Sequence, residues 1–493
     1  MRPYIALFMG FILHVGGSAQ PFSVRNDYNG AMGSEAGLKV FVKPYGYQIL
    51  QGGYSTANAF FRICFVDVSN TGTVAELGSF GRDSLTCFPG AANGPTQLGA
   101  DSYVFGGTDD GIHGRSVLWR FGPGPDSLWT AQIYGDTVDW TTGRSVRSSN
   151  GQVVTTGEVY HSGQSGQLFL GGVDTVGTLV SLHEYGTSVR NQAWSLDTCF
   201  DGGYVLGGDA WFSTLDHDAY VVKTDAAGNE LWHQYLGGPY GDLFASVIQA
   251  RDTAYVVVGA TSEYNSGSVD FYRLYAARLD AVGDPEWERN YGLLSSANFL
   301  VSVAELNDGS FIAAGALDAV GGARGALLHF AANGDSLWLR SYRHPPLDSV
   351  FSTHWLYHAT QDSDGSIVAT GLCTDGQQDL WVIRVDSFGC LVPGCQLYDH
   401  VAEQAALPGQ EDLHILAYPN PVHDRLAISF RSAATPTGAF RLYDAQGRVI
   451  RKFAPGGRSE EIDLDVRPHP PGLYVLHYAD RRGTHWSQRI VIE

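Results

Sequence analysis

The sequence predicts an all-β protein with a long repeated part followed by a smaller β-sandwich. Three observations carry this prediction: 61 glycines among 493 residues, glycine-ended apolar runs that recur about every fifty residues, and a change of charge near residue 413. Hydrophobic residues make up 44% of the chain, which excludes general disorder. A chain of 493 residues is too long for one hydrophobic core, so at least two domains or a repeat array are expected.

The charge balance narrows the classes of partner. The formal net charge is −20, from 31 Lys and Arg against 51 Asp and Glu. Such a surface repels phosphate backbones and anionic membranes, so no nucleic-acid partner is expected. No run in the mature chain approaches the roughly 20 apolar residues of a transmembrane helix, so no transmembrane segment is expected there.

Residues 1–19 are predicted to be a signal peptide. Arg2 supplies the positive charge, residues 4–15 form a mostly apolar run, and small residues follow. Cleavage is expected between Ala19 and Gln20. A buried first strand or helix is the alternative. Export would make the mature chain a secreted or surface protein in an oxidising compartment.

Six cysteines fit such a compartment, because an even number can pair there. Cys390 and Cys395 are expected to form a disulfide, since Pro393 and Gly394 between them can turn the chain back. Because this disulfide would close so short a loop, it contributes about 2 kcal/mol of stability in the chain-entropy model, and its effect is local. The other four either pair, in one of three ways, or stay buried as small apolar side chains: Cys64, Cys87, Cys199 and Cys373.

A repeat of about fifty residues is the strongest signal in the sequence. Each unit contains a β-branched or aromatic run that ends on glycine, such as YVLGG at 204–208 and YVVVG at 255–259. Turn sequences such as DGG and DGS often precede these runs, so we expect a strand that begins after a turn and ends at the glycine. The repeat glycines are Gly53, Gly107, Gly157, Gly208, Gly259, Gly315 and Gly371.

Each unit carries three further short strands. One precedes the glycine-ended run, as ASVIQA does at 245–250, and another follows it, as DAYVVKTD does at 218–225. A strand containing tryptophan comes after the next turn. Tryptophans at the same place in successive units are expected to pack between neighbouring sheets, with stacking platforms for carbohydrate as the alternative. They are Trp129, Trp232, Trp287 and Trp338.

Seven units of four strands predict a seven-bladed β-propeller over residues 20–395. One four-stranded sheet cannot bury both of its apolar faces, so neighbouring sheets stack, and strand twist makes the stack radial. The seventh unit lacks a good tryptophan strand, whereas FSVRNDYNG at 22–30 resembles WERNYG at 287–292. Residues 22–29 are therefore predicted to complete the last blade and close the ring.

The units resemble those of kelch, WD-repeat and PQQ-binding quinoprotein propellers, the last through the turn-and-tryptophan pattern at 225–232. They most closely resemble the degenerate propeller repeats of exported proteins of Bacteroidetes. The resemblance covers residues 22–395, and it is specific for architecture rather than for activity.

A second domain is predicted after a linker at residues 396–412. Residues 413–493 contain 11 Lys and Arg against 8 Asp and Glu, or +3, whereas the rest of the chain carries 20 against 43, or −23. A step of this size marks a domain boundary. Segments such as RLAISF at 425–430 and GLYVLHYAD at 472–480 predict a small, immunoglobulin-like antiparallel β-sandwich.

The motifs YPNP, LYDAQGRVI and PPGLYVL and the terminal RIVIE resemble the type IX secretion system C-terminal sorting domain, type A. The resemblance implies that the signal peptide takes the chain across the inner membrane, and that this domain takes it across the outer membrane of a Bacteroidetes-type Gram-negative bacterium. Type IX secretion machinery is the implied partner, and removal of the domain, with surface attachment or release, would follow. An ordinary immunoglobulin-like stalk is the alternative. The matching positions are Pro419, Asn420, Pro421, Gly447, Gly472, Leu473 and Tyr474.

No catalytic residue is assigned, because the sequence contains no G-x-S-x-G elbow, H-E-x-x-H helix, P-loop or C-x-x-C pair. His354 and His358 are expected to share one face of a strand as core or channel residues rather than to form a metal pair. Asp218, Asp270 and Asp379 recur before a strand and are expected to accept backbone N–H bonds in turns. Calcium ligation is the alternative for these aspartates, and no other cofactor is expected.

Three functions fit these observations. The leading one is a non-catalytic exported propeller that binds a glycan or a protein at the mouth of its channel. The second is a quinoprotein-like or glycan-processing enzyme, and a glycosidase would require two carboxylates facing one pocket. The third is a structural surface-layer component, recognisable by self-association.

Overall fold

The computed structural model contains only β-strands among the residues that it describes, which confirms the predicted all-β class. No helix in these residues is long and apolar enough to cross a membrane. The chain divides into two compact units, Met1–Pro393 and Gly394–Glu493. The described residues are 20–27, 32–55, 60–80, 87–89, 94–99, 102–109, 115–122, 127–133, 145–147, 150–161, 165–186, 188–213, 216–238, 240–265, 270–295, 298–318, 322–344, 352–374, 377–391, 413–418, 422–432, 438–444, 448–456, 459–470, 472–479 and 485–492.

The described part of the first unit contains six hydrogen-bonded sheets, where the sequence predicts seven. The difference arises because one parallel pair, Ser34 with Gln378, joins two antiparallel groups into an eight-stranded sheet. Group one consists of β2 (Met32–Lys43), β3 (Gly46–Ser55), β4 (Phe60–Ser69) and β5 (Val74–Phe80). Group seven consists of β27 (His354–Gln361), β28 (Ile367–Thr374), β29 (Gln378–Val385) and β1 (Phe22–Asn26).

Groups two to six are separate antiparallel sheets that follow in chain order. Group two has β6 (Cys87–Pro89), β7 (Thr96–Gly99), β8 (Ser102–Asp109), β9 (Arg115–Phe121) and β10 (Ser127–Gln132), and group three has β11 (Ser145–Arg147), β12 (Val153–Val159), β13 (Gln167–Val173) and β14 (Leu179–Tyr185). Group four has β15 (Arg190–Thr198), β16 (Tyr204–Trp211), β17 (His217–Thr224) and β18 (Glu230–Leu236). Group five has β19 (Leu243–Gln249), β20 (Tyr255–Asn265), β21 (Asp270–Leu279) and β22 (Pro285–Ser295), and group six has β23 (Phe299–Glu305), β24 (Phe311–Leu317), β25 (Arg324–Phe330) and β26 (Ser336–Tyr342).

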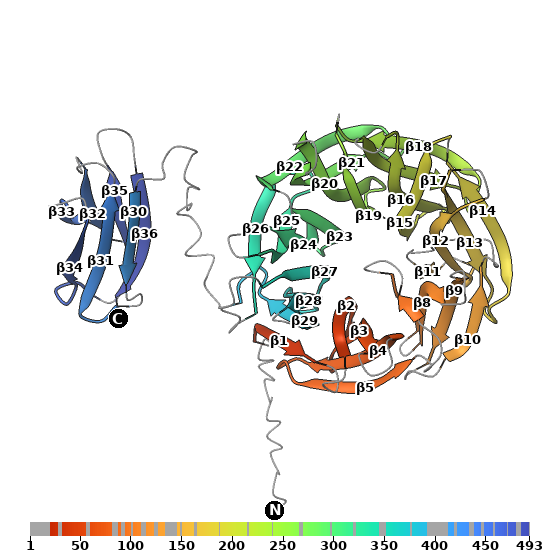
Figure 1. Ribbon diagram of the computed structural model, residues 1–493, viewed down its shortest axis with the longest axis horizontal. Coiled ribbons are helices and arrows are strands. Elements are labelled where there is room, and N and C mark those ends of the chain that lie inside the picture. The colour runs from red at the N-terminus through yellow and green to blue at the C-terminus, as the bar shows by residue number, and fades with distance from the viewer. Residues whose placement is uncertain are drawn as a thin grey trace, which may run out of the picture. The chain divides into compact units, whose positions relative to one another are not determined.

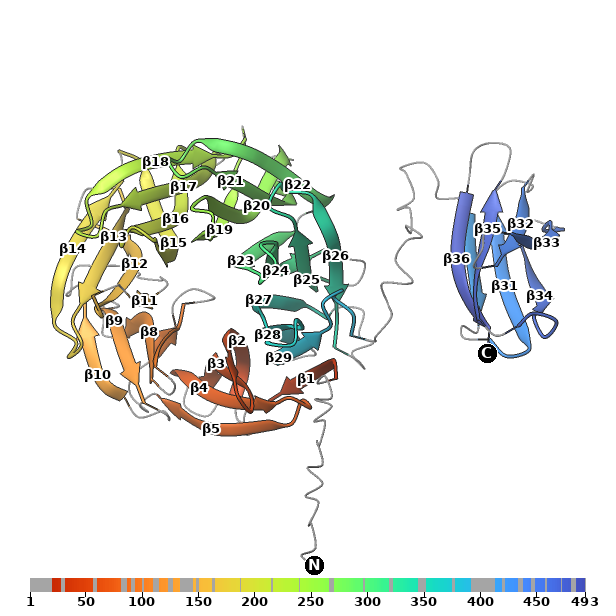
Figure 2. The same cartoon turned by 180° about the vertical axis from the view of Figure 1, so that it is seen from behind.

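Figures 1 and 2 show the groups following one another around a common centre, with group seven beside group one. Each apolar core of this unit takes its residues mainly from two neighbouring groups. Val40 and Ile49 of group one, for example, pack with Leu380 and Val382 of group seven. Because a four-stranded sheet is apolar on both faces, this sharing buries the two faces of each group.

The first strand pairs with the end of the repeated part, as the likeness of its sequence to a fourth strand predicts. β1 runs antiparallel to β29, with Phe22 opposite Arg384 and Asn26 opposite Leu380. The Arg25 guanidinium forms an ion pair with Asp379, whose side chain is 1% exposed. A buried charge of this kind is stabilising only while it has its partner, so Arg25 holds β1 in one register.

The predicted tryptophans are partly buried and pack between groups, as expected. Each indole lies against the left-handed turn glycine of the next group, where a Cβ would strike the ring. Phe22 of β1 occupies the corresponding place over Gly72, whose φ is +84°. The tryptophan and glycine pairs are Trp129 with Gly177, Trp232 with Gly283, Trp287 with Gly334, and Trp338 with Gly389.

The repeat glycines do not end their strands, so that part of the prediction is wrong. β16 continues past Gly208 to Trp211, and the reason lies in the neighbouring strand. In groups four to seven the first strand has a β-bulge beside the glycine, as where Leu356 pairs with Gly371 and the register shifts. A Cβ on any of these four glycines would collide with a carbonyl oxygen of the first strand. The bulge therefore requires the glycine.

The other three repeat glycines also lie inside strands. Gly53 pairs with Glu35 and Arg62, and Gly107 pairs with Pro89 and Val117. Gly157 pairs with Phe169.

The second unit contains two sheets that share one apolar core. The strands expected from the sequence are present, and β30 is an additional one that precedes them. One sheet has β30 (Leu413–Tyr418), β31 (Arg425–Ser432) and β34 (Ser459–Asp465), and the other has β33 (Val449–Phe453), β32 (Ala439–Tyr443), β35 (Gly472–Ala479) and β36 (His485–Ile492).

Candidate functional site

A cavity of about 420 Å³ lies where groups four and five meet. Its volume falls within the range of about 300–1,000 Å³ that is usual for small-molecule pockets. The run GGPYGD at 237–242, which connects β18 to β19, supplies part of the wall. The lining residues are Gly237, Gly238, Tyr240, Thr261, Ser262, Tyr275, Glu288 and Asn290.

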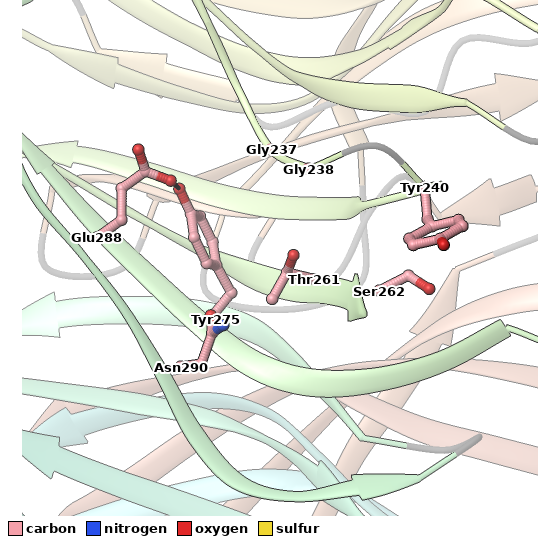
Figure 3. Close-up of a pocket in the computed structure, with 8 residues that line it drawn as sticks. All are labelled: Gly237, Gly238, Tyr240, Thr261, Ser262, Tyr275, Glu288 and Asn290. Atoms are coloured by element: carbon pink, nitrogen blue, oxygen red, sulfur yellow. Dashed lines mark hydrogen bonds between the residues drawn. The ribbon is translucent and has the colours of Figure 1, made fainter. Parts of the chain in front are cut away.

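Figure 3 shows the Tyr275 hydroxyl beside the Glu288 carboxylate at one end of these residues, with the Tyr240 ring at the other. The hydroxyl donates a hydrogen bond of 2.6 Å to Glu288 Oε2. Burial and then this carboxylate raise the pKa of Tyr275 well above its usual range. Tyr275 therefore stays protonated and acts as a hydrogen-bond donor rather than as a nucleophile.

Asp242 fixes the wall of the cavity from behind. Its Oδ2 accepts the Gly238 N–H at 2.6 Å, and its Oδ1 accepts the Ser262 N–H at 2.8 Å. These bonds connect the loop of group four to β20 of group five. Asp242 is 3% exposed, and burial raises the pKa of its carboxyl although the hydrogen bonds oppose this.

Asp218 lies next to Asp242. A Cβ on Gly237 would meet Asp242 Oδ2 and Asp218 Oδ1, both no farther than 2.7 Å away, so the two carboxyl groups flank one point of the backbone. Gly237 has φ +154°, a conformation that also favours glycine. Burial first, then the charges of Asp242 and Asp216, raise the pKa of Asp218 to about 7.

No local sequence pattern marks this cavity, because its residues come from a loop and three strands. Tyr240 in the glycine-rich run GGPYGD is the one local signal, since an aromatic residue stands in a connection between sheets. For Asp218 the sequence predicts an acceptor of backbone N–H bonds in a turn. That interpretation is wrong, since Asp218 Oδ1 is buried and makes no hydrogen bond within the described structure.

The turn acceptors are different aspartates. Asp379 pairs with Arg25, and the side chain of Asp270 lies outside the described residues. The residues that do accept two backbone N–H bonds at tight turns through Oδ1 are Asp174, Asp225, Asp280 and Asp386. No group of three or more His, Cys, Asp or Glu side chains with the geometry to hold a metal ion occurs in the described ranges.

His354 and His358 do not share a face, contrary to the expectation. The bulge between Leu356 and His358 shifts the alternation of side chains by one residue. The His354 ring packs edge-on against Trp381 with 5.2 Å between ring centroids, whereas His358 Nδ1 accepts the Val40 N–H of group one. Burial, and then nearby cationic groups, lower the pKa of His354 to about 4.

The predicted sites near the termini are described only in part. Gln20 is the first described residue and Ala19 lies outside the described residues, as does Cys395, so the cleavage site and the Cys390–Cys395 disulfide stay predictions. Cys390 itself is buried. Cys64, Cys199 and Cys373 are buried thiols, which corresponds to the second alternative for them; the Cys87 side chain is not described.

Of the sorting-motif positions, Gly472, Leu473 and Tyr474 begin β35. The buried Tyr474 hydroxyl donates a 2.7 Å hydrogen bond to the Pro470 carbonyl and so closes the turn before the strand. The remaining positions lie outside the described residues: Pro419, Asn420, Pro421 and Gly447.

The second unit matches a known family. Residues 416–493 match the model of the secretion system C-terminal sorting domain. This match supports the predicted type IX sorting domain, and it indicates a secreted or outer-membrane surface protein of a Bacteroidetes-type bacterium that the type IX machinery recognises. No curated protein sequence matches the chain.

Several solved structures are similar to the chain at low identity. A lectin from Burkholderia pseudomallei, BP39L, is 13% identical, with 73% of this chain and 98% of the lectin covered and a TM-score of 0.47. A puromycin hydrolase is 14% identical, with 81% and 58% covered and a TM-score of 0.42. PorZ, a surface component of the type IX secretion system of Porphyromonas gingivalis, is 9% identical, with 93% and 75% covered and a TM-score of 0.22. Similarity at this level does not decide between their functions.

Proposed function

We propose that the chain is an exported seven-bladed β-propeller that binds a carbohydrate in the cavity between groups four and five. The sorting domain provides the route to the cell surface. The cavity, with its mixed aromatic and polar lining, is the observation that carries the binding proposal.

The propeller is supported by the way the groups share their apolar cores. Each neighbouring pair of groups contributes to one core, and the pair of group seven with group one is included. The antiparallel pairing of β1 with β29 places the start of the repeated part on its last group. Phe22 over Gly72 repeats at this junction the contact that Trp287 makes with Gly334 elsewhere. A ring has no exposed apolar end face, whereas an open array would leave two in water.

Carbohydrate binding is supported by the chemistry of the lining. Glu288 and Asn290 are exposed to solvent and offer acceptor and donor groups for sugar hydroxyls. Tyr240, 36% exposed, presents a ring face on which a sugar can stack. Thr261 and Ser262, both buried, also line the cavity. Binding without turnover fits this arrangement, because Tyr275 stays protonated and neither Asp218 nor Asp242 lines the cavity.

The proposal is tested with the purified full chain on a glycan array, followed by calorimetric titration of the sugars that bind. We expect Tyr240→Ala to weaken binding about tenfold, since loss of one stacking ring costs on the order of 1 kcal/mol. The matched control is Tyr45→Ala, which removes another exposed tyrosine, in group one.

Two results would contradict the proposal. The first is sugar binding that Tyr240→Ala leaves unchanged. The second is release of cleaved product from a bound glycan, which would indicate a glycan-processing enzyme. Self-association of the full chain without any sugar ligand would instead favour a surface-layer component.

A further inference from the structure

The second unit carries a positive surface that the proposed carbohydrate binding does not use. Its sheet of β33, β32, β35 and β36 buries Phe440, Leu442 and Leu476 in the shared core. Because side chains alternate along a strand, the residues between these point away from the core. We call that side the outer face of the sheet, and we infer that it binds an acidic protein surface of the type IX secretion machinery.

Basic residues stand side by side on the outer face. Arg441 of β32 pairs with Lys452 of β33 on one side and with His477 of β35 on the other. Residues directly opposite each other share a face, so three neighbouring strands form one basic row. Arg441 and Lys452 carry like charges, which destabilise a sheet when they stand opposite each other. The stability of the domain therefore does not explain the row, whereas a negatively charged partner removes the repulsion.

The domain itself does not neutralise the basic row. Arg441 and Lys452 form no ion pair among the residues that the structure describes. None of the described outward positions of β32, β33 and β35 is Asp or Glu. The outer face therefore keeps positive charge that other parts of the unit balance with their own aspartates. The balanced pairs are Arg425 with Asp463, Arg448 with Asp444, and Arg467 with Asp465.

An apolar row runs beside the basic row. Tyr443 of β32 pairs with Val449 of β33 and with Val475 of β35. Val449 is 50% exposed, and Tyr443 and Val475 are partly exposed. The Tyr443 ring packs edge-on against His477, with 6.3 Å between the ring centroids, so the two rows are continuous. Tyrosine and arginine are enriched at protein interfaces, and this face presents both.

The two rows together favour a protein over an anionic glycolipid as the partner. Phosphate groups of a glycolipid would contact the basic row alone and leave Val449 in water. An acidic protein surface with apolar side chains beside its carboxylates contacts both rows, so that apolar burial adds to the attraction between charges. Residues 416–493 match the sorting domain that the type IX machinery recognises, so a component of that machinery is the partner.

The test is export of the full chain by a bacterium that has a type IX system. Arg441→Glu with Lys452→Glu should lower the amount of chain at the surface and in the medium at least fivefold, because the reversed charges repel an acidic partner. The remainder should be held in the periplasm. Arg441→Lys with Lys452→Arg keeps both charges and should be exported within twofold of the parent chain. Immunoblots of the cell fractions measure both variants.

A matched pair of variants separates the outer face from charge in general. Arg441→Gln with Lys452→Gln removes two charges that the domain leaves unbalanced and should lower export at least threefold. Arg425→Gln with Arg448→Gln removes two charges that the domain balances itself, and export should stay within twofold of the parent. Thermal unfolding of each purified full chain checks that the variant is folded.

Two export results overturn the inference. The first is export of the folded Arg441→Glu, Lys452→Glu chain at the level of the parent. The second is an equal loss of export in the Arg441→Gln, Lys452→Gln and Arg425→Gln, Arg448→Gln chains, which would make total charge the cause.

Sedimentation with phosphatidylethanolamine vesicles that contain lipopolysaccharide tests the other class of partner. We expect no binding of the full chain through Arg441 and Lys452. Vesicle binding that is lost with Arg441→Glu and Lys452→Glu would assign the outer face to an anionic glycolipid and overturn the protein partner. Sugar binding in the cavity of the first unit is measured separately and should be the same in all these variants, so the two proposals fail independently.

Discussion

Groups four to seven and groups one to three carry the same glycine repeat in different surroundings. In the later groups the glycine faces a bulge of the first strand, as Gly315 does beside Leu300. In group one the bulge between Gly37 and Lys39 lies beside Leu50 and Gln51, so Gly53 is not the residue that it crowds. In group two the first position is divided between β6 and β7. A shared sequence repeat therefore does not imply one shared structural cause.

A second difference between the groups concerns the residue just before the last residue of the third strand. In groups four, five and seven a cation there pairs with the aspartate of the turn between the first two strands. Group six has His329, which reaches Asp308 through Ser310. Group two has Arg120 at this place, but its Nε donates to the Ser102 hydroxyl instead. Groups four, five and seven thus fasten the third strand to this turn with an ion pair, whereas the contact of Arg120 in group two is with a neutral hydroxyl. The pairs are Lys223 with Asp201, Arg278 with Asp252, and Arg384 with Asp364.

The largest effect that tests this comparison is expected at a bulge. Gly371→Ala should lower the free energy of unfolding by about 3 kcal/mol, because the added Cβ collides with the Trp355 carbonyl oxygen and the backbone has to shift. Gly99→Ala in group two is the control, since a Cβ there has open space around it, and it should change stability by less than about 0.5 kcal/mol. Urea unfolding of the full chain measures both. Similar losses from the two substitutions would contradict the bulge explanation.

A smaller effect is expected at the third-strand cations. Arg384 is 1% exposed, and its guanidinium lies 2.5 Å from Asp364 and 2.7 Å from the Tyr47 hydroxyl. Arg384→Met should destabilise the chain by about 2 kcal/mol, because it leaves the partly buried carboxylates without their cation. Arg120→Met should cost less than about 1 kcal/mol, since its partners are neutral. Thermal unfolding measures both losses of stability. Equal losses from the two substitutions would contradict the difference between these groups.

The smallest effect concerns pH and the aspartate pair in group four. The pKa of Asp218 is raised to about 7 in the folded chain, so its contribution to stability is present at low pH and is lost as the pH rises through about 7. Asp218→Asn removes this loss. At pH 8.5 the variant should be more stable than the parent chain by on the order of 1 kcal/mol, after allowance for solvent screening of a half-buried group.

At pH 5, close to the unfolded-state pKa of an aspartate at about 3.9, the gain of the Asp218→Asn variant should be less than half of that at pH 8.5. Unfolding midpoints at the two pH values check this, and a gain of the same size at both would show that charge is not the cause.

The sequence was sufficient for the features that follow from periodicity. Alternation predicted the strands of the second unit, and the recurring tryptophans predicted contacts between groups, because both depend on side-chain spacing alone. The likeness of residues 22–30 to a fourth strand predicted the pairing that β1 makes with β29. These features need no knowledge of register.

Features that depend on register were missed. The bulge in β27 moves His358 to the other side of the strand from His354, and no residue type announces that shift. The cavity brings Tyr240, Tyr275 and Glu288 together from a loop and two strands of different lengths. The raised pKa of Asp218 depends on Asp242, which lies 24 positions later in the sequence. Contacts of this kind require the three-dimensional arrangement of two groups.

The central claim is that residues 20–391 form a ring fastened by the first strand on the last group. The most direct test is a cysteine pair at Val24 and Val382, which face each other across β1 and β29. In the purified chain with Val24→Cys and Val382→Cys, mild oxidation should link these two positions nearly completely, as peptide mass mapping would show. Val24→Cys with Val42→Cys, a partly exposed position of β2, should remain unlinked. Absence of the 24–382 link in a folded chain would contradict the account.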